Sequence, residues 1–418
     1  MFKVFKSPEL RKKILFTVAI IAIFRLLAHI PVPGVDTSAI RAYLQKSVFF
    51  SFFDLFSGGG FQNFSIVTLG LGPYINASII VQLLTMLIPS LEELSKEGES
   101  GQERIDMYTK LLTVPMAFIQ SYGIYFLLSK QRVINTLNPM NLVILLLTFT
   151  AGSMLLVWLG QLVTEHGVGN GISLLIFVSI ISRLPTSAIS TVTGIQASSI
   201  QTTLIFAALA LAVIVAVVLV DEGTRNIVLE YGRRAERSEK VTNYLPIKVN
   251  QAGVIPIIFA VSIVSIPGMI GGPFAASDSI KLKTIGYFLT TYFHSGTAFY
   301  NLIYFLMVVA FTFFYTFISF SPDKIAEDIK KRGGFIPGVR PGTSTAEYLK
   351  KIVTRITLAG AIFLGLIAIL PYLLQSFIGT GSMAIGGTSL LIVVSVVLET
   401  VRQVESLMVT RSYEKFLG

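Results

Sequence analysis

The stretch from Ser57 to Leu84 reads SGGGFQNFSIVTLGLGPYINASIIVQLL and decides what kind of fold this chain forms. From Pro73 onward it is an apolar run without a charged residue, and an apolar run of about 20 residues crosses a bilayer as a helix. Before Pro73, five glycines interrupt any continuous helix. The stretch therefore predicts a membrane span that is preceded by an irregular, glycine-rich segment.

The glycine-rich segment has two interpretations. Phe61–Leu69 lies between the Gly58-Gly59-Gly60 run and Gly70, and it is long enough for about two helical turns. One interpretation is an external amphipathic loop. The other is a re-entrant half-helix at membrane depth, which is tolerated only where it is buried in protein or lines a wet cavity. The residues of the segment leave both interpretations open.

The composition of the whole chain is that of a polytopic membrane protein. Of its 418 residues 53% are hydrophobic and 13% are charged, whereas soluble domains carry about 25% charged residues. The chain holds no cysteine, which excludes a disulfide scaffold, a thiol nucleophile and a Cys-ligated metal. Ten apolar stretches are long enough to span a membrane. They lie near residues 14–30, 73–89, 111–128, 142–163, 172–189, 203–220, 252–270, 300–320, 352–374 and 388–409.

Basic residues predict the orientation of these spans. With the N-terminus in the cytoplasm, 25 of the 33 Lys and Arg residues fall on the cytoplasmic side, 7 on the other side, and Arg25 within the first span. This asymmetry predicts that both termini are cytoplasmic. The first span follows a basic run, as a signal peptide does, but no small-residue cleavage site follows it, so we interpret it as a retained anchor.

Ten spans divide into two sets of five that would lie in opposite orientations, as in many transport proteins. We expect an N-terminal half over residues 1–190, a hinge on the non-cytoplasmic side over residues 191–202, and a C-terminal half over residues 203–418. Two long basic loops, residues 221–251 and 321–351, would face the cytoplasm. Alternating residues in the first loop predict strands at 225–231 and 243–249. Structured loops of this length are typical docking surfaces.

A secondary transporter and a membrane enzyme, such as a lipid-modifying transferase, are the competing functional classes. Ion-coupled transporters use carboxylates or His inside the membrane, but Arg25 is the deepest ionisable residue of the predicted spans. No H-E-x-x-H motif is present. The run Gly167–Gly171 lacks the ending of a phosphate loop and predicts a tight turn with Asn170 as the cap of the next helix. The sequence thus favours a passive conduit without catalytic residues, metal or cofactor.

Six motifs occur in order along nearly the whole chain. They are FSGGG (56–60), LGLGPYINASIIVQLL (69–84), WLGQLVTEHGVGNGIS (158–173), LPIKVNQAGVIPIIFA (245–260), FIPGVRPGTSTAEYL (335–349) and GGTSLLIVVSVVLETVRQVESLM (386–408). Together they resemble the SecY family, the central subunit of the bacterial protein-translocation channel. The resemblance implies an all-α fold in which ten membrane helices form two inverted five-helix halves, a clam-shell, around a central pore.

The resemblance also implies the site residues. A ring of branched aliphatic side chains would narrow the pore and disfavour water and ions. Its members would be Leu71, Ile75, Ile172, Ile176, Ile258 and Ile392. The short half-helix Phe61–Leu69 would be a re-entrant plug, at about residues 57–70, that lies under the ring. Its main residues would be Gly58, Gly59, Gly60, Phe61, Phe64 and Ile66. A lateral gate toward lipid would open between the second and seventh spans, at Asn76, Ile79, Gln82 and Ser262.

The remaining implications concern partners. The basic loops would dock the SecA motor or the ribosome, with Arg340 as the main contact residue and Arg225, Arg233 and Arg234 as secondary ones. Small membrane subunits, SecE and SecG, would complete the complex. The substrates would be unfolded preproteins with signal sequences, and membrane segments would leave into lipid. The location would be the bacterial inner membrane, and no cofactor is implied because the partner supplies the energy.

Overall fold

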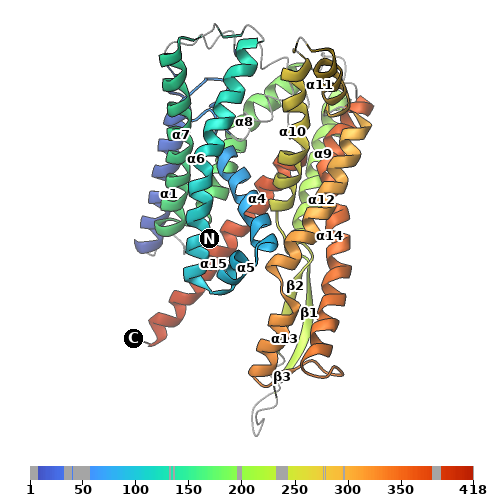
Figure 1. Ribbon diagram of the computed structural model, residues 1–418. Helices are drawn as coiled ribbons and strands as arrows, with labels where there is room; N and C mark the ends of the chain where they lie inside the picture. The colour runs from blue at the N-terminus through green and yellow to red at the C-terminus, as the bar shows by residue number, and fades with distance from the viewer. Residues whose placement is uncertain are drawn as a thin grey trace. The chain divides into compact units, whose positions relative to one another are not determined.

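The structure is a computed structural model, and it describes residues 8–32, 40, 57–130, 133–134, 137–194, 200–231, 243–275, 277, 279–294, 297–378 and 387–417. Helices dominate the described chain (Figure 1). Each of the ten predicted spans coincides with a helix. In chain order these are α1 (Pro8–Leu27), α4 (Gly72–Leu87), α6 (Glu99–Lys130), α7 (Pro139–His166), α8 (Gly171–Gly194), α9 (Ile200–Glu222), α10 (Ile255–Ala275), α12 (Ala298–Ser319), α14 (Thr343–Ile378) and α15 (Gly387–Leu417).

Several of these helices meet the requirements of a membrane span by length and composition. Among the described residues they are α6, α7, α10, α12 and α14. A further candidate is α4 together with α5 (Pro89–Lys96), a pair bent by 102°. Shorter elements lie between the spans: α11 (Ile280–Tyr292), α13 (Pro322–Lys331) and the strands β1 (Thr224–Tyr231), β2 (Asn243–Lys248) and β3 (Gly334–Phe335).

The chain packs as two compact units. The first comprises Met1–Gly194, Pro267–Ser295 and Val396–Gly418, and the second comprises Ile195–Ile266 and Gly296–Ser395. Both α10 and α15 therefore contribute residues to each unit. The division into two inverted halves with a hinge at residues 191–202 stays a prediction.

Close helix packing in the first unit depends on glycine. Here α7 packs against α8, and a Cβ atom added to Gly171 of α8 would lie 1.9 Å from the carbonyl oxygen of Gly160 on α7. The turn between the helices is closed by Asn170, whose Oδ1 accepts a hydrogen bond from the Ser173 N–H at 3.0 Å. This confirms the predicted cap. The Val168 N–H donates to Thr17 Oγ1 at 3.1 Å, which ties α1 to the same turn.

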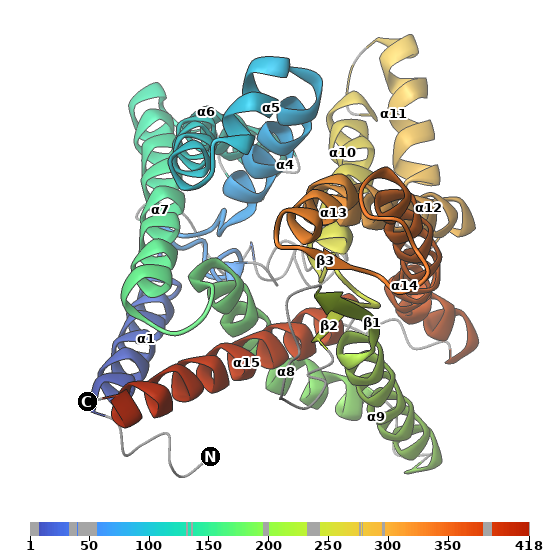
Figure 2. The same cartoon turned by 90° about the horizontal axis from the view of Figure 1, so that it is seen from below.

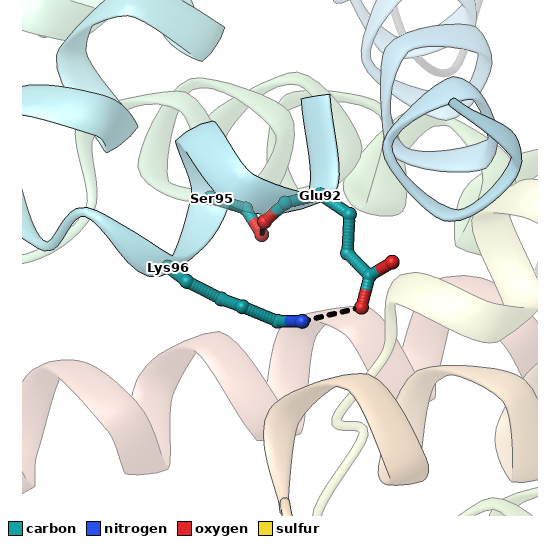
Figure 3. A network of polar contacts seen from close by, with 3 residues as sticks. All are labelled: Glu92, Ser95 and Lys96. Atoms are coloured by element: carbon teal, nitrogen blue, oxygen red, sulfur yellow. Dashed lines mark hydrogen bonds and ion pairs between the residues drawn. The ribbon is translucent and has the colours of Figure 1, made fainter. Parts of the chain in front are cut away.

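The bend between α4 and α5 marks the end of an apolar helix. Pro89 occupies the first turn of α5, where its missing N–H costs nothing. Lys96 contacts the Glu92 carboxylate at 2.6 Å, and the Ser95 hydroxyl donates to the Glu92 carbonyl at 2.7 Å (Figure 3). Because both charged side chains are exposed, the ion pair contributes about 0.5 kcal/mol or less. The short helix α5 is thus a polar surface element.

The second unit combines packed helices with a small sheet. Helix α12 packs along α14, and α13 packs against α14 and β3. The sheet has the order β2-β1-β3, with β1 antiparallel to both neighbours. Figure 2 shows the sheet beside α13 and α14. Strands β1 and β2 confirm the two predicted strands, whereas β3 is too short to be read from the sequence. Ile227 and Leu229 of β1 are buried in a cluster with Leu349 of α14, which fixes the sheet to the helices.

Gly171→Ala tests the close approach of α7 and α8. The added methyl group forces the helices apart, and overpacking of this kind costs about 1–3 kcal/mol. We expect a lower midpoint of thermal unfolding in detergent micelles. The control is Gly123→Ala in α6, because an added Cβ at Gly123 meets nothing within 4 Å. Equal melting temperatures for the two variants would contradict the described packing.

Candidate functional site

Residues 57–71, which precede α4, form a run of turns. The Phe64 N–H donates to the Phe61 carbonyl at 3.1 Å, and the Thr68 N–H donates to the Ser65 carbonyl at 3.0 Å. The sequence predicted a half-helix over Phe61–Leu69, and the structure replaces it with these turns. The reason is backbone conformation. The φ angle is positive at Gly58, Gly59, Phe64 and Gly70, and a right-handed helix cannot continue through such residues.

The irregular segment is buried by apolar packing in the first unit. Phe61, Phe64 and Leu69 belong to one core cluster with residues of α6 and α7, and Ile66 packs against it. Phe64 is fully buried, and its ring meets the Phe149 ring edge-on with centroids 5.1 Å apart. Phe64 also has a φ of +44°, which costs a residue with a side chain about 1–2 kcal/mol. The packing of the two rings offsets this strain.

Backbone hydrogen bonds join the segment to the chain that follows α1. The Val32 N–H donates to the Phe64 carbonyl at 2.9 Å, and the Ile66 N–H donates to the Ile30 carbonyl at 3.1 Å. Pro31 and Ser65 form an isolated antiparallel bridge at the same place. The segment therefore pairs with residues 30–32 as a very short ribbon, which satisfies polar groups that a helix would satisfy internally.

Side chains from two helices, α1 and α7, bind the carbonyl groups at the two ends of the segment. Arg25 of α1 donates from Nη1 to the Gly58 carbonyl at 2.6 Å and to Ser182 Oγ of α8 at 3.0 Å. Ser153 Oγ of α7 donates to the Gly70 carbonyl at 3.0 Å. A Cβ atom added to Gly152 of α7 would lie 1.8 Å from the Ile66 carbonyl oxygen, so only glycine admits the segment so close to α7.

The groups that hold residues 57–71 in place, which we call the seat, could mostly not be predicted from the sequence. The Gly152-Ser153 pair stands in an apolar span, and small residues in membrane helices signal close approach of another backbone. Arg25 was noted only as the deepest ionisable residue. Its partners lie 33 and 157 residues away in the chain, so no local pattern identifies them.

The predicted ring residues lie on four helices of the two units. In the first unit, Leu71 is the residue before α4 and Ile75 follows one turn later, and both are buried. Ile172 and Ile176 occupy the first two turns of α8; Ile176 is buried, and Ile172 covers Gly160 of α7. In the second unit, Ile258 on α10 and Ile392 on α15 are also buried. Their closure into one ring stays a prediction.

Two of the predicted gate residues, Gln82 and Ser262, make side-chain hydrogen bonds within their own helices. Gln82 donates from Nε2 to Ser78 Oγ at 3.2 Å on α4, and Ser262 donates to the Ile258 carbonyl at 2.8 Å on α10. Ile79 is buried and Asn76 is partly buried. Within the described part of the chain, Gln82 Oε1 is buried and accepts no hydrogen bond. A seam between α4 and α10 stays a prediction.

Two of the predicted docking residues are exposed in the second unit. Arg340 lies in the loop between β3 and α14, and its carbonyl accepts a hydrogen bond from Thr345 Oγ1 at 2.9 Å. Ile336 and Val339 of that loop pack into the sheet cluster, so they anchor the exposed arginine. Arg225 is exposed on β1, opposite Ile247. Arg233 and Arg234 lie outside the described residues.

Neither a metal site nor a catalytic group emerges from this geometry. Over the residues that the structure describes, no group of three or more His, Asp or Glu side chains is placed to hold a metal ion. Near the irregular segment, the described contacts include an arginine, hydroxyl groups, the Asn63 amide and apolar side chains. These groups hold a polypeptide segment in place.

Comparison with known proteins identifies the family. The model of the SecY family matches residues 65–401. The protein translocase subunit SecY of Corynebacterium glutamicum is 40% identical over 442 aligned positions, which cover 100% of this chain and 99% of that protein. The chain belongs to the SecY family. It is therefore a channel subunit of the Sec protein translocase and a multi-pass membrane protein, and it is not an enzyme.

Solved structures of this family share the fold. One concerns a SecY protein whose plug domain stabilises the closed state of the translocation channel and maintains a membrane seal. The superposition covers 95% of this chain and 92% of that SecY chain, with a TM-score of 0.66 and 18% sequence identity. Another is Sec61 in a canine ribosome–channel complex from the endoplasmic reticulum, with a TM-score of 0.61, 18% identity, and 95% and 92% coverage. These likenesses support the expected all-α channel fold.

Phe64→Ala tests the apolar seat of the irregular segment. Removing a fully buried phenylalanine costs about 3–5 kcal/mol, since the cavity between the segment and Phe149 cannot collapse completely. We expect a clear fall in the midpoint of thermal unfolding. Phe118→Ala in α6, where the ring is 44% exposed, should change it little. A Phe64→Ala variant as stable as the Phe118→Ala variant would contradict the described packing of Phe64 against Phe149.

Proposed function

We propose that this SecY-family chain conducts unfolded preproteins through a pore whose neck is the ring of Leu71, Ile75, Ile172, Ile176, Ile258 and Ile392. The observation that carries the proposal is the buried irregular segment, which runs directly into Leu71 and Ile75 at the start of α4. Branched aliphatic side chains disfavour water and ions and offer no fixed hydrogen-bond partners. A neck of this kind passes any extended sequence without binding it.

Residues 57–70 are the plug in this proposal. The segment is irregular, glycine-tethered at Gly58-Gly59-Gly60, and held by packing and by single hydrogen bonds rather than by a continuous helix. A SecY relative of solved structure has a plug domain that stabilises its closed channel. An element held by many weak contacts stays in place at rest and leaves when a polypeptide enters.

The lateral gate runs between α4 and α10 in this proposal. Gln82 supports it, because its Oε1 is a buried acceptor that the described residues leave unused. Asn76, Ile79 and Ser262 complete the seam. Hydrogen bonds between membrane helices contribute only about 0.6 kcal/mol on average. Such a seam opens when a hydrophobic signal helix binds, and it lets membrane segments pass sideways into lipid.

The basic loops dock the partner that supplies energy. Arg340 is exposed at the end of an anchored, proline-containing loop, and Arg225 is exposed on β1 of the same unit. Arg233 and Arg234 follow β1 in the sequence and belong to the same proposed docking loop. The chain contains no phosphate-binding motif, so a motor ATPase, SecA, or a translating ribosome must drive transport. A related channel of solved structure is bound to a ribosome.

The complex lies in the bacterial inner membrane with both termini of this chain in the cytoplasm. The excess of Lys and Arg in the predicted cytoplasmic loops supports this orientation. SecE and SecG are the small membrane subunits that complete it. No cofactor takes part.

Site-directed crosslinking tests the pore. A photo-reactive amino acid at Ile75 or Ile392 should crosslink to a secretory chain that is stalled during export, because both side chains would touch the passing polypeptide. A photo-reactive residue at Ile119, an exposed position on α6, is the control and should not crosslink to it. Assembled translocase that shows no crosslink at Ile75 or Ile392 would exclude these residues from the pore.

Arg340→Glu tests the docking surface. Reversing the charge at an exposed contact should reduce SecA-dependent export several-fold, at least about tenfold if the arginine pairs with a carboxylate. The amount of assembled channel in the membrane should not change. Lys281→Glu, at an exposed position predicted to face the other side of the membrane, should export normally. Normal export by the Arg340→Glu variant would remove Arg340 from the docking site.

A further inference from the structure

Arg25 connects three separate parts of the first unit. It lies on α1 within the first predicted span, and its guanidinium donates to the Gly58 carbonyl at 2.6 Å and to Ser182 Oγ at 3.0 Å. Gly58 begins the glycine tether, and Ser182 lies on α8. One partly buried cation therefore joins α1, α8 and the residues that lead into the plug.

The tether lies close against both helices that Arg25 bridges. A Cβ atom added to Gly58 would lie 3.0 Å from the Phe24 ring of α1 and 3.2 Å from Ser179 Oγ of α8. The Phe24 ring is almost fully buried. Gly58 also has a φ of +64°, a conformation that favours glycine. The carbonyl that Arg25 binds is thus placed by a tight backbone approach.

An arginine inside a membrane span is expensive to bury, and such residues commonly mark function. A charged donor forms hydrogen bonds about twice as strong as neutral ones, and a guanidinium holds two acceptors in fixed geometry. By contrast, Ser153 and the backbone amides that bind the segment are neutral, as is the Asn63 side chain, whose Nδ2 donates to the Ala28 carbonyl at 3.2 Å. Arg25 is therefore suited to control when the tether is released.

We propose that Arg25 is a positioning residue that latches the plug in the closed channel by holding the Gly58 carbonyl against α1 and α8. The inference rests on the proposed role of residues 57–70 as the plug. Opening requires the guanidinium to give up the Gly58 carbonyl while it keeps Ser182 as a partner. The latch thus sets how readily the plug leaves, and it contributes nothing to the neck or to the docking surface.

Cysteine labelling in assembled translocase measures how often the plug leaves its seat. Because the chain holds no cysteine, Val67→Cys introduces a single thiol at a fully buried position of the plug. A membrane-impermeant maleimide added to reconstituted vesicles reaches that thiol only when the plug leaves its seat. In this background Arg25→Met should raise the labelling rate at least about tenfold, since charge-assisted hydrogen bonds are lost.

Three further variants locate the effect. Arg11→Met makes the same change at an exposed position of α1 and should label like the parent protein. Arg25→Lys should fall between the parent and Arg25→Met, because lysine keeps the positive charge but loses the fixed planar geometry of the guanidinium, whose Nη1 donates to both acceptors. Ser182→Ala should raise the rate less than Arg25→Met, since the Gly58 hydrogen bond remains.

Preprotein transport by the same vesicles separates the latch from the proposed function. Faster labelling in Arg25→Met with transport retained supports the latch. Unchanged labelling in Arg25→Met, or equally faster labelling in Arg11→Met, overturns it and leaves the channel proposal intact. If Arg25→Met fails to assemble, unchanged labelling in Ser182→Ala overturns the latch. Failure of the parent protein to transport a preprotein with all partners present overturns the proposed function instead, and the latch with it.

Discussion

Every backbone N–H and C=O group of an irregular segment inside a membrane protein needs a partner from the protein, because lipid offers none. Residues 57–71 meet this requirement partly through hydrogen bonds within their own turns and partly through distant groups. Ile30 and Val32 bind the middle of the segment, Arg25 binds its start and Ser153 binds its end. A helix would satisfy its own backbone and could be held by apolar contacts alone. Turns need a seat, and the seat determines the arrangement of α1, α7 and α8 around the segment.

With the proposed role of residues 57–70 as the plug, the same contacts also explain how a closed channel remains able to open. Packing of Phe61 and Phe64 stabilises the segment, while the strained φ of Phe64 and the glycine tether lower the cost of leaving. Most of the polar contacts are single hydrogen bonds, each of about 1 kcal/mol net. Arg25 differs because it carries a charge and binds two acceptors. A set of weak contacts with one stronger contact releases an element cooperatively.

Much of the fold follows from patterns within short stretches. Apolar runs predicted each helix that coincides with a span, since about 20 apolar residues satisfy a bilayer wherever they occur. Alternation predicted β1 and β2, and Asn170 predicted the cap of α8. The half-helix over Phe61–Leu69 did not form, because positive φ angles at Phe64 and at the flanking glycines divide the segment into turns. The short β3 gave no pattern because only two residues pair.

The sequence by itself determined that this chain spans a membrane many times and that its motifs are those of the SecY family, and it predicted that most basic residues lie in cytoplasmic loops. These properties follow from composition and local order, which need no knowledge of distant contacts. Only the tertiary structure decided where the irregular segment lies and what holds it. Arg25 meets Ser182 across 157 residues, and Gly152 admits the Ile66 carbonyl from another part of the chain. Contacts of this kind depend on how distant helices pack, and no local pattern in the sequence identifies the partner of a given residue.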